Sequence, residues 1–475
     1  MKILMIEPPP ISSYGNLRVL GSFGAPKCEI VWAPLDLMMI GGALKKHGFD
    51  FEIFDASATF ASLTQVKDKI KEVNPDIVIF TTSLTTIDKD LALASIAKQI
   101  RRGIVTVAFG TPIMTLPEEF MGLNSDLDIA VFGEPELPIL DLVENDLSAE
   151  GVKGICYRKN STLIKNAPHP LCQNLDEFGI PAHDKVPFKL YRDPMMKRRP
   201  MTLTAAQRGC INACIFCCNP LYGNFRKRSV GNVIEELRFM MDLGIKELNF
   251  FDAGMTHDHV WSNALFDRMI NEKIDITWKG NSRANRLTKD MASKMKMAGC
   301  HTVQIGAESA DLTVLKNIGK NVTPEEIRTA VNIAKKAGLN VLVYFSFGWP
   351  GETKESMART VRFAKSLKTD LVTFGHASPH PGTVFYEYIE KHGFFNTREW
   401  EKFDPLFKPV FDYPNLTSDE MHAMVNQAYK SFYLRPGYMV RRALSIRSFL
   451  EMRNNMVNFG SFISRYVFPS RVKIG

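Results

Sequence analysis

The stretch "MTLTAAQRGCINACIFCCNP", residues 201–220, joins a short strand-like run to a loop that holds four of the chain's eight cysteines. Cys210, Cys214 and Cys217 have the spacing C-x3-C-x2-C, and Cys218 follows directly. Three thiolates on one short loop can each bind one iron of a four-iron cluster, which leaves the fourth iron open. An open iron can chelate a small molecule that carries an amine and a carboxylate.

A zinc site is the alternative interpretation of this loop. Structural zinc is normally closed by four ligands, no second cysteine pair lies nearby, and C-x3-C-x2-C is not a common zinc spacing. A plain zinc-bearing barrel nevertheless stays open as an interpretation. Cys218, which directly follows the third cysteine, is either a small buried residue beside the loop or a catalytic thiol.

The chain around and after this loop repeats a strand and a helix six times. The first helix begins with Ser229 as a plausible N-cap and ends at Gly244. Six units are too few for a complete eight-unit barrel and predict an open, partial (β/α)6 TIM barrel, with chemistry at the carboxyl ends of its strands. The predicted strands are 201–206, 246–251, 275–279, 301–306, 339–347 and 370–375, and the later helices are 258–272, 288–298, 323–337, 353–367 and 384–392.

Residues 1 to about 145 alternate in the same way, which predicts a doubly wound parallel sheet of the Rossmann-like kind. The predicted strands are 2–7, 51–56, 76–80, 105–109 and 128–132, and the predicted helices are 37–47, 63–73, 88–101 and 117–122.

Ligands of such sheets bind outside the carboxyl ends of the strands. Small and hydroxyl-bearing residues stand at four of these ends, in "EPPP", "TTSLTT", "GTP" and "GEPE". Ordinary turn chemistry would explain any one of these loops, but the four together favour a site for a large polar ligand. The candidate residues are Glu7, Pro9, Thr82, Ser83, Leu84, Gly110, Thr111, Gly133 and Glu134.

Length and composition indicate a folded protein of several domains. The chain has 475 residues, of which 45% are hydrophobic and 23% are charged. We expect four parts: a sheet domain (1–148), a linker with a small hairpin (149–199), the barrel (200–394) and a helical C-terminal domain (395–475). The start of the chain lacks the pattern of a signal peptide, and no apolar run is long enough to span a membrane. We therefore expect a cytoplasmic protein with reduced thiols.

The net charge of +8 belongs mainly to the C-terminal tail. Residues 435–475 hold seven arginines and one lysine against the single acid Glu451. The helical stretch 437–466 interleaves these arginines with apolar residues. It is either a packed cap with a solvated basic face or a surface for a lipid or an acidic macromolecule, including peripheral contact with a membrane.

The sequence resembles the cobalamin-dependent (class B) radical S-adenosylmethionine (SAM) enzymes. The cysteine spacing, the aromatic Phe216 before the third cysteine and the loop's place after a first barrel strand carry the resemblance. It extends to "GAES", "GWPGET" and "HPGT" in the barrel and to "PLDLMMIGGALKKHGFDFEIFDA", "FGTPIMTLPEEF" and "DIAVFGEPE" in an N-terminal cobalamin-binding domain.

The resemblance implies roles for individual barrel residues. Cys210, Cys214 and Cys217 would hold a [4Fe-4S] cluster, and Phe216 would lie against the adenine of SAM. Asp252 and Gly254 occupy the family's amine-binding turn, although "FFDAG" does not reproduce a Gly-Gly-Glu motif. The further candidates are Arg283 for the carboxylate, Gln304 and Glu308 near the ribose and amine, and Tyr344, His376, His380 and His257 for the substrate cavity.

Structural alternatives remain for several of these residues. Arg283 and Glu308 could form an ion pair inside the barrel mouth, and any one of the histidines could be structural. In the N-terminal domain the sequence lacks a D-x-H-x-x-G motif, so cobalamin would bind base-off without a histidine from that motif. Some relatives keep this domain and do not use cobalamin.

The resemblance implies a radical SAM C-methyltransferase in an anaerobic setting. It would move a methyl group from methylcobalamin to an unactivated sp3 carbon through a 5'-deoxyadenosyl radical, with two SAM per turnover. The alternatives are an oxidative cyclase or rearrangement enzyme without net methyl transfer, and a non-enzymatic cobalamin or redox sensor. The expected partners are a low-potential donor of the ferredoxin or flavodoxin type and a substrate that is a protein or peptide side chain, a tetrapyrrole or a lipid; nucleic acid is not expected.

Overall fold

A computed structural model describes residues 1–12, 17–18, 30–404 and 407–467. The chain divides into two compact units. The first holds residues 1–193 and 221–236, and the second holds residues 194–220 and the described residues from 237 onward. Most of the stretch predicted as a linker therefore belongs to the first unit.

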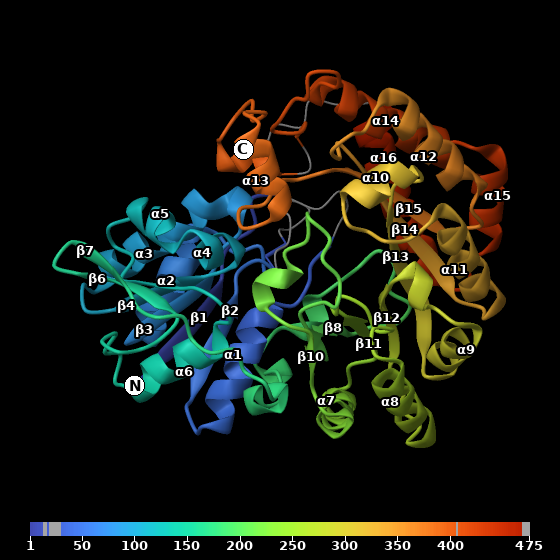
Figure 1. Ribbon diagram of the computed structural model, residues 1–475. Helices are drawn as coiled ribbons and strands as arrows, with labels where there is room; N and C mark the ends of the chain where they lie inside the picture. The colour runs from blue at the N-terminus through green and yellow to red at the C-terminus, as the bar shows by residue number, and fades with distance from the viewer. Residues whose placement is uncertain (13–16, 19–29, 405–406, 468–475) are drawn as a thin grey trace. The chain divides into compact units, whose positions relative to one another are not determined.

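The sheet of the first unit contains the five predicted strands in the order β2-β1-β3-β4-β5, all parallel (Figure 1). Two further strands, β6 and β7, form the predicted hairpin, and β6 pairs antiparallel with β5. This pairing explains why the hairpin belongs to the sheet domain. The strands are β1 (Ile3–Glu7), β2 (Phe51–Asp55), β3 (Ile77–Thr81), β4 (Val105–Phe109), β5 (Ile129–Val131), β6 (Ile155–Lys159) and β7 (Thr162–Lys165).

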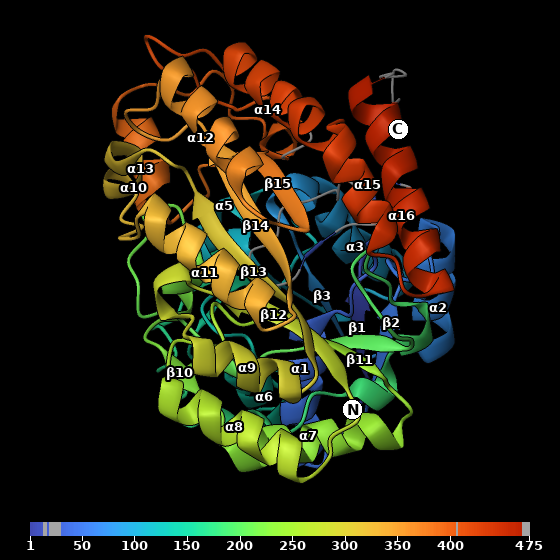
Figure 2. The same ribbon diagram turned by 90° about the vertical axis from the view of Figure 1, so that its right-hand side faces the viewer.

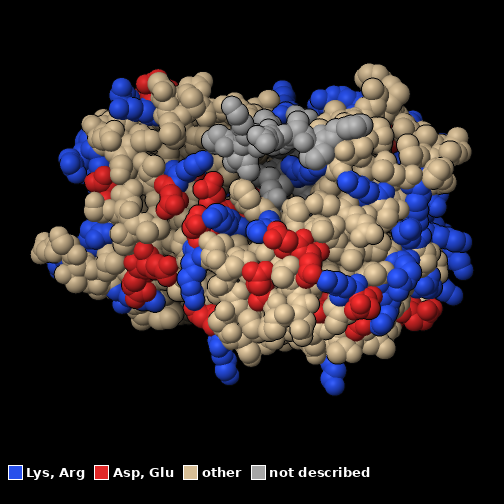
Figure 3. All heavy atoms as spheres, turned by 90° about the horizontal axis from the view of Figure 1, so that it is seen from above, with Lys and Arg blue, Asp and Glu red and all other residues tan. Residues whose placement is uncertain are grey.

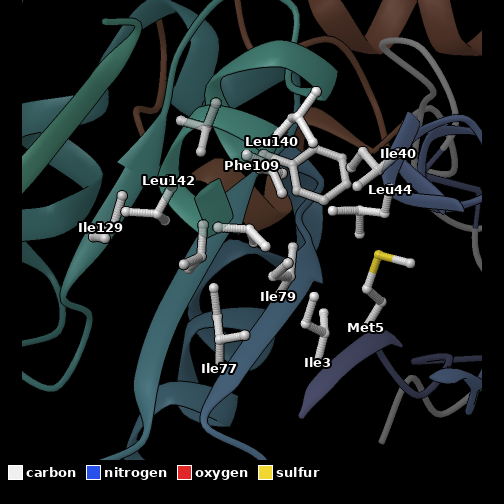
Figure 4. Packing of buried hydrophobic residues seen from close by; sticks show 14 of the residues in the cluster. Ile3, Met5, Ile40, Leu44, Ile77, Ile79, Phe109, Ile129, Leu140 and Leu142 are labelled. Atoms are coloured by element: carbon white, nitrogen blue, oxygen red, sulfur yellow. The ribbon is translucent and has the colours of Figure 1, made fainter. Parts of the chain in front are cut away.

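Apolar side chains of the strands and of two helices form the core of this unit (Figure 4). Ile3, Met5 and Ile77 of the sheet pack with Ile40 and Leu44 of α1. The sequence patterns missed α4 and α6, which are short, and placed the other helices within one or two residues. The helices are α1 (Leu35–Lys46), α2 (Leu63–Val73), α3 (Ile87–Ile100), α4 (Thr111–Thr115), α5 (Pro117–Gly122) and α6 (Glu136–Glu144).

The second unit is built on six parallel strands, each beside its predecessor in the series. This open, partial barrel and the parallel sheet of the first unit confirm the predicted fold class. The strands are β8 (Met201–Thr204), β11 (Glu247–Phe250), β12 (Thr277–Ser282), β13 (Cys300–Glu308), β14 (Asn340–Phe347) and β15 (Leu371–His376). Two-residue strands also occur at β9 (Gln207–Arg208) in this unit and β10 (Arg226–Lys227) in the first.

Helices follow the barrel strands in the predicted places and cover the outer side of the sheet (Figure 2). Ser229 accepts a hydrogen bond from the backbone N–H of Asn232, which confirms it as the N-cap of α7. The first residues of α7, up to residue 236, belong to the first unit, and the rest of the helix belongs to the second. The helices are α7 (Val230–Asp242), α8 (His259–Asn271), α9 (Lys289–Met297), α10 (Leu312–Asn317), α11 (Pro324–Lys336), α12 (Lys354–Ser366) and α13 (Val384–Lys391).

Three helices end the described chain: α14 (Ser418–Tyr433), α15 (Pro436–Leu444) and α16 (Phe449–Phe462), which a short π-helical turn continues to residue 467 (Figure 2). The prediction of one helical stretch over 437–466 was wrong, because the chain breaks between α15 and α16. Ser448 caps the new helix by accepting a hydrogen bond from the backbone N–H of Glu451. In the described part of the chain, no helix is long and apolar enough to cross a bilayer.

Candidate functional site

The cysteine loop lies at the carboxyl end of β8, where a second segment of the barrel holds it in place. The backbone N–H of Ile215 donates to the carbonyl oxygen of Ile318 at 3.2 Å. Gly319 has a φ of +65°, and a Cβ atom there would lie 2.8 Å from the carbonyl oxygen of Ala213. Only glycine fits this close approach, so the segment 318–320 helps to fix the loop.

N–H groups surround the sulfur of Cys210. Nε2 of His257 lies 3.4 Å from Cys210 Sγ, and Nδ2 of Asn212 donates to the same sulfur at 3.4 Å. Sequence reasoning had placed His257 near the substrate, whereas the structure places its ring against the first cysteine. Gly254 makes room for this ring, because a Cβ atom on Gly254 would lie 2.7 Å from His257 Cε1.

The other two sulfurs face donors as well. Cys217 Sγ accepts hydrogen bonds from the backbone N–H and the side-chain amide of Asn219, at 3.4 and 3.3 Å. Cys214 Sγ lies 3.9 Å from a guanidinium nitrogen of Arg283. Cys214 Sγ also lies 3.7 Å from the carbonyl oxygen of Gly319. A thiolate can only accept hydrogen bonds, so the donors beside each sulfur suit negative charge there.

The described residues include no group of three or more His, Cys, Asp or Glu side chains arranged to hold a single metal ion. A four-iron cluster places a different demand on the protein, because each of its cysteine ligands binds a separate iron. The arrangement of Cys210, Cys214 and Cys217 on one loop, each beside N–H donors, fits that demand.

Cys218 differs from its three neighbours. Its side chain is buried, with 8% exposure, whereas the other three cysteines of the loop are half-buried. Burial, and then the neighbouring Cys217, raises the pKa of Cys218 to about 12, so its thiol stays protonated at neutral pH. The structure thus places Cys218 as a packed residue.

Asp252 follows the end of β11 and holds the backbone in place where the chain enters the cysteine loop. Its carboxylate accepts a hydrogen bond from the backbone N–H of Gln207 at 2.5 Å, and its carbonyl oxygen accepts from Asn281 at 2.7 Å. The side-chain amide of Gln207 is buried and has no hydrogen-bond partner within the described residues. A buried amide without a partner fits a polar ligand that would complete its hydrogen bonds.

Two further candidates, Gln304 and Tyr344, are brought together in one hydrogen-bonded chain. Tyr344 donates its hydroxyl proton to Gln304 Oε1 at 2.7 Å, and the amide nitrogen of Gln304 donates to Asn281 Oδ1 at 3.3 Å. Through Asn281 this chain reaches the backbone of Asp252. Residues in or just after four neighbouring strands, β11 to β14, therefore form one polar network.

Glu308 has a different partner from the one that the sequence suggested. Its carboxylate pairs with Lys320 at 2.9 Å and accepts a hydrogen bond from Ser346 at 2.9 Å. The proposed alternative, an ion pair between Arg283 and Glu308, was wrong, because Arg283 lies against Cys214. Sequence reasoning missed Lys320, which lies in a loop that carries no strand-end signal.

An aromatic contact supports Phe216. Its ring lies 4.7 Å from that of Trp349, and Lys320 Nζ lies 5.9 Å from the centre of the Phe216 ring. The loop that carries Trp349 is held by Glu352, whose carboxylate accepts hydrogen bonds from the backbone N–H groups of Gly348 and Trp349 at 2.6 and 3.1 Å. Burial raises the pKa of Glu352 to about 8.

The two remaining histidine candidates lie at or after the end of β15. The ring of His376 stacks on that of His422 of α14, with 5.2 Å between the ring centres. His380 is buried, and burial lowers its pKa to about 4, so its ring is neutral at pH 7. Both histidines are thus packed within the second unit.

In the first unit, Glu7 belongs to a buried charged cluster at the carboxyl end of β1. Arg18 pairs with Glu7 at 3.3 Å and with Asp90 at 2.8 Å, and Thr81 donates to Glu7 at 2.5 Å. The carbonyl oxygen of Pro9 also accepts from Arg18 at 3.0 Å. Burial raises the pKa of Glu7, and the charge of Arg18 opposes that shift.

Glu134, at the end of β5, is also engaged by an arginine. Arg226 binds its two carboxylate oxygens at 2.7 and 2.8 Å, and both side chains are at least 93% buried. This bidentate pair fastens the segment 221–236 to the sheet of the first unit. The carboxylates of Glu7 and Glu134 therefore have partners within the chain, which sequence reasoning did not predict.

The other strand-end candidates lie in the loops after β3, β4 and β5, and we call this set the cradle of small residues: Thr82, Ser83, Leu84, Gly110, Thr111 and Gly133. Gly110 has a φ of +136°, and a Cβ atom there would lie 2.3 Å from the carbonyl oxygen of Thr82. At Gly133, with a φ of +82°, a Cβ atom would meet nothing within 4 Å. The backbone is thus open at the end of β5, as close approach by a large ligand requires. Ser83 and Leu84 are buried beside Thr82, and Thr111 is half-buried after Gly110.

Comparisons with known families agree with the division of the candidate residues between the two compact units. The sequence model of the radical SAM superfamily matches residues 205–364, and that of the B12 binding domain matches residues 25–143. The first match contains the cysteine loop and the network at the barrel strand ends. The second contains the cradle of small residues.

Three relatives illustrate the similarity. An uncharacterized methyltransferase of Pyrococcus horikoshii is 34% identical over 459 residues, which cover 95% of this chain and 97% of the relative. The anaerobic magnesium-protoporphyrin IX monomethyl ester cyclase of Cereibacter sphaeroides is 24% identical over 92% of this chain and 71% of its own. The solved structure of TsrM from Kitasatospora setae, a radical SAM methyltransferase with cobalamin and a [4Fe-4S] cluster bound, shares the fold, with a TM-score of 0.69 and 15% identity over 97% of this chain and 99% of its own.

Proposed function

Because this chain belongs to the cobalamin-dependent radical SAM enzymes, we propose that it is a C-methyltransferase for an unactivated sp3 carbon. In this proposal the methyl group comes from methylcobalamin, a 5'-deoxyadenosyl radical activates the substrate, and two SAM are used per turnover. The observation that carries the proposal is the similarity, over 95% of the chain, to a relative named as a methyltransferase. We do not propose a non-enzymatic cobalamin or redox sensor, because the family consists of enzymes.

Cofactors supply the chemistry in this proposal: when bound, they provide a radical that removes hydrogen and a methyl group that can be transferred. The chain's task is to hold them and to exclude water. Cys210, Cys214 and Cys217 would each hold one iron, and the N–H donors around their sulfurs would stabilise the negative charge there. Phe216, supported by Trp349, would offer an apolar face for the adenine of SAM.

Residues at the strand ends would bind the rest of SAM. Arg283 beside Cys214 would pair with the carboxylate. Glu308 would accept the amine while it stays paired with Lys320, since a carboxylate can accept several hydrogen bonds. Gln304, held by Tyr344, would face the ribose. Asp252 and Gly254 would act through the backbone of their turn, because Asp252 binds Gln207 and Gly254 admits the ring of His257.

The first unit would bind base-off cobalamin in the cradle of small residues. The hydroxyl groups and backbone of Thr82, Ser83 and Thr111 would contact it, with Leu84, Gly110 and Gly133 leaving it room. Glu7, Glu134 and Pro9 would contribute by fixing the strand ends, since arginines engage them. Tyr344, His376 and His380 remain the candidates for contact with the substrate, and the enzyme would work in the cytoplasm with a low-potential electron donor.

An oxidative cyclase is the second candidate function. The similarity to the magnesium-protoporphyrin cyclase, which extends over 92% of this chain, favours this function. The sequence identity to that cyclase is 24%, which is lower than the 34% identity to the methyltransferase of Pyrococcus horikoshii. The two functions differ in product mass. A methyltransferase adds one methyl group, whereas an oxidative cyclase removes hydrogen and adds none.

The test uses the full chain, reconstituted anaerobically with iron, sulfide and cobalamin, and SAM with a deuterated methyl group. Incubation with reductant and with separate peptide, lipid and tetrapyrrole fractions should give 5'-deoxyadenosine and one product that carries the deuterated methyl group. A Cys210→Ala variant should give neither. Formation of 5'-deoxyadenosine and a changed product without the label would favour the cyclase, and absence of both from the wild type would refute the proposal.

A further inference from the structure

The outer side of α16 carries an apolar stripe. Phe449, Met452, Met456 and Phe459 recur at intervals of three or four residues, so they lie along one side of the helix. Their exposed fractions are 77%, 41%, 68% and 48%. A helix that belongs to a packed core turns such a stripe inward, whereas α16 turns it outward.

Polar and apolar residues share the side by which α16 meets the rest of the second unit. Asn454 is 6% exposed and its amide donates to the carbonyl oxygen of Met196 at 3.4 Å. Glu451 pairs with Lys197 at 2.8 Å. Phe462 also packs inward, with its ring 5.5 Å from that of Tyr433, so α16 is apolar on its inner side and again on its outer side.

The preceding helix extends this apolar area. Met439, Val440 and Leu444 of α15 have exposed fractions of 42%, 60% and 70%. Single exposed apolar residues are common, but adjacent ones mark interaction sites. We call the following set the C-terminal apolar surface: Met439, Val440, Leu444, Phe449, Met452, Met456 and Phe459.

Arginines accompany this surface without acidic partners. The described residues 435–467 contain six arginines, and none of the six pairs with a carboxylate within the described chain. The single acid of the segment, Glu451, is taken by Lys197. Figure 3 shows Lys and Arg side chains at the right-hand edge of the view, the side on which α11, α12 and α15 all lie in Figure 1. The six arginines are Arg435, Arg441, Arg442, Arg447, Arg453 and Arg465.

We propose that the C-terminal apolar surface docks the protein on a bilayer that contains anionic lipids. A helix with exposed Phe and Met on one side and arginines beside them lies in the headgroup region, with its apolar side toward the acyl chains. The arginines would meet lipid phosphates, which attract each basic residue near the surface. A second copy of the chain is a poorer occupant, because it would bring the exposed Arg441, Arg447 and Arg453 of one copy toward those of the other.

Vesicle flotation tests this proposal with the full reconstituted chain. We expect the protein to float with vesicles of three parts phosphatidylcholine to one part phosphatidylglycerol, and only weakly with pure phosphatidylcholine. Replacement of the stripe by Phe449→Ser, Met456→Ser and Phe459→Ser should weaken binding about tenfold or more. Arg447→Glu with Arg453→Glu should weaken it about 25-fold or more, since each arginine near an anionic surface is worth roughly fivefold.

Matched variants elsewhere in the second unit serve as controls. Val260→Ser with Met297→Ser removes side chains that are 82% and 61% exposed on α8 and α9. Lys289→Glu with Lys296→Glu reverses two exposed charges on α9. Both controls should float like the wild type. The proposal would be overturned if the wild type did not float, or if the control variants lost as much binding as the stripe variants. It would also be overturned if the wild type formed a dimer and did not bind vesicles, and the stripe variant dissociated that dimer.

Discussion

At the scale of single residues, the four thiols of the cysteine loop divide into three and one. The sulfurs of Cys210, Cys214 and Cys217 each lie beside N–H groups of other side chains. Cys218 is buried, and its pKa is raised to about 12 by burial. Spacing along the chain suggested this division, and the surroundings of each sulfur support it.

The division gives a first prediction. Cys218→Ala should keep the iron and sulfide of the reconstituted protein, since it removes only a small packed side chain, while Cys210→Ala should lose the intact cluster. Iron and sulfide analysis with the absorption spectrum measures both. Loss of iron from the Cys218 variant would contradict this division of roles.

His257 gives a second prediction at this scale. An N–H donated to a cluster sulfur stabilises the extra negative charge of the reduced cluster and raises its potential. His257→Phe keeps a ring in the space above Gly254 but removes the donor to Cys210. We expect one-electron reduction to become about tenfold less favourable, which is about 59 mV.

A redox titration followed by electron paramagnetic resonance measures this potential, and iron analysis shows whether the cluster is intact. The matched control is His259→Phe, because His259 is half-buried and its ring nitrogen Nε2 bonds to the carbonyl oxygen of Arg286, away from the cysteine sulfurs. An intact cluster with an unchanged potential in the His257 variant would show that the hydrogen bond has no influence.

At the scale of elements, loops that follow different strands clamp the cysteine loop. Segment 318–320 contacts its backbone, and the loop after β14 presents Trp349 to Phe216. Contacts of this kind join positions that are more than 100 residues apart in sequence. Periodicity identified the strands and helices around these loops but gave no information on which loops meet.

The clamp gives a third prediction, for Gly319→Ala. The new methyl group would lie 2.8 Å from the carbonyl oxygen of Ala213, and the φ of +65° would add about 1–2 kcal/mol of backbone strain. We expect lower thermal stability and reduced iron incorporation. Gly338→Ala is the matched control, because its φ is +76° and its Cβ atom would approach only Lys296 Cε, at 3.8 Å. It should be destabilised without loss of iron; equal iron loss in both variants would contradict the clamp.

A fourth prediction concerns Glu352, whose pKa burial raises to about 8. Folding raises the pKa of this carboxyl group, so the folded protein holds the proton more tightly than the unfolded chain does. The group therefore contributes its full stability at a pH below the pKa of the unfolded chain, and that stability is lost as the pH rises through the pKa of the folded protein. The wild type should therefore lose roughly 3 to 5 kcal/mol at this site between about pH 4.5 and 8. The Glu352→Gln variant keeps an oxygen that can accept the hydrogen bonds from Gly348 and Trp349. Because its amide does not titrate, its free energy of unfolding should not fall in this way as the pH rises.

Thermal unfolding of both proteins from pH 5 to 8 tests this expectation. The unfolding temperature of the wild type should fall relative to that of the Gln variant as the pH rises. A constant difference across this range would mean that Glu352 does not titrate there.

At the scale of the whole molecule, the two predicted cofactor sites belong to separate compact units. The cysteines lie in the second unit and the cradle of small residues in the first. Each unit has its own buried core and its own parallel sheet. The residues for each cofactor are therefore supplied by one unit.

This separation gives a fifth prediction. A variant with Cys210, Cys214 and Cys217 all changed to Ala should lose the iron yet bind cobalamin with the stoichiometry of the wild type. Absorption spectra of the gel-filtered protein after incubation with hydroxocobalamin measure both. Loss of cobalamin together with iron would show that the first unit cannot form its site alone.

Local sequence patterns were enough to predict the two alternating βα series, the order of nearly all their elements and the three-plus-one pattern of cysteines. These features follow from local periodicity and from spacing within one loop, which neighbouring residues control. The tertiary structure alone decided that Glu308 pairs with Lys320, that His257 faces Cys210 and that α16 turns its apolar stripe outward. Each of these depends on which distant segments meet, and that is fixed by strand register and by packing of the assembled barrel.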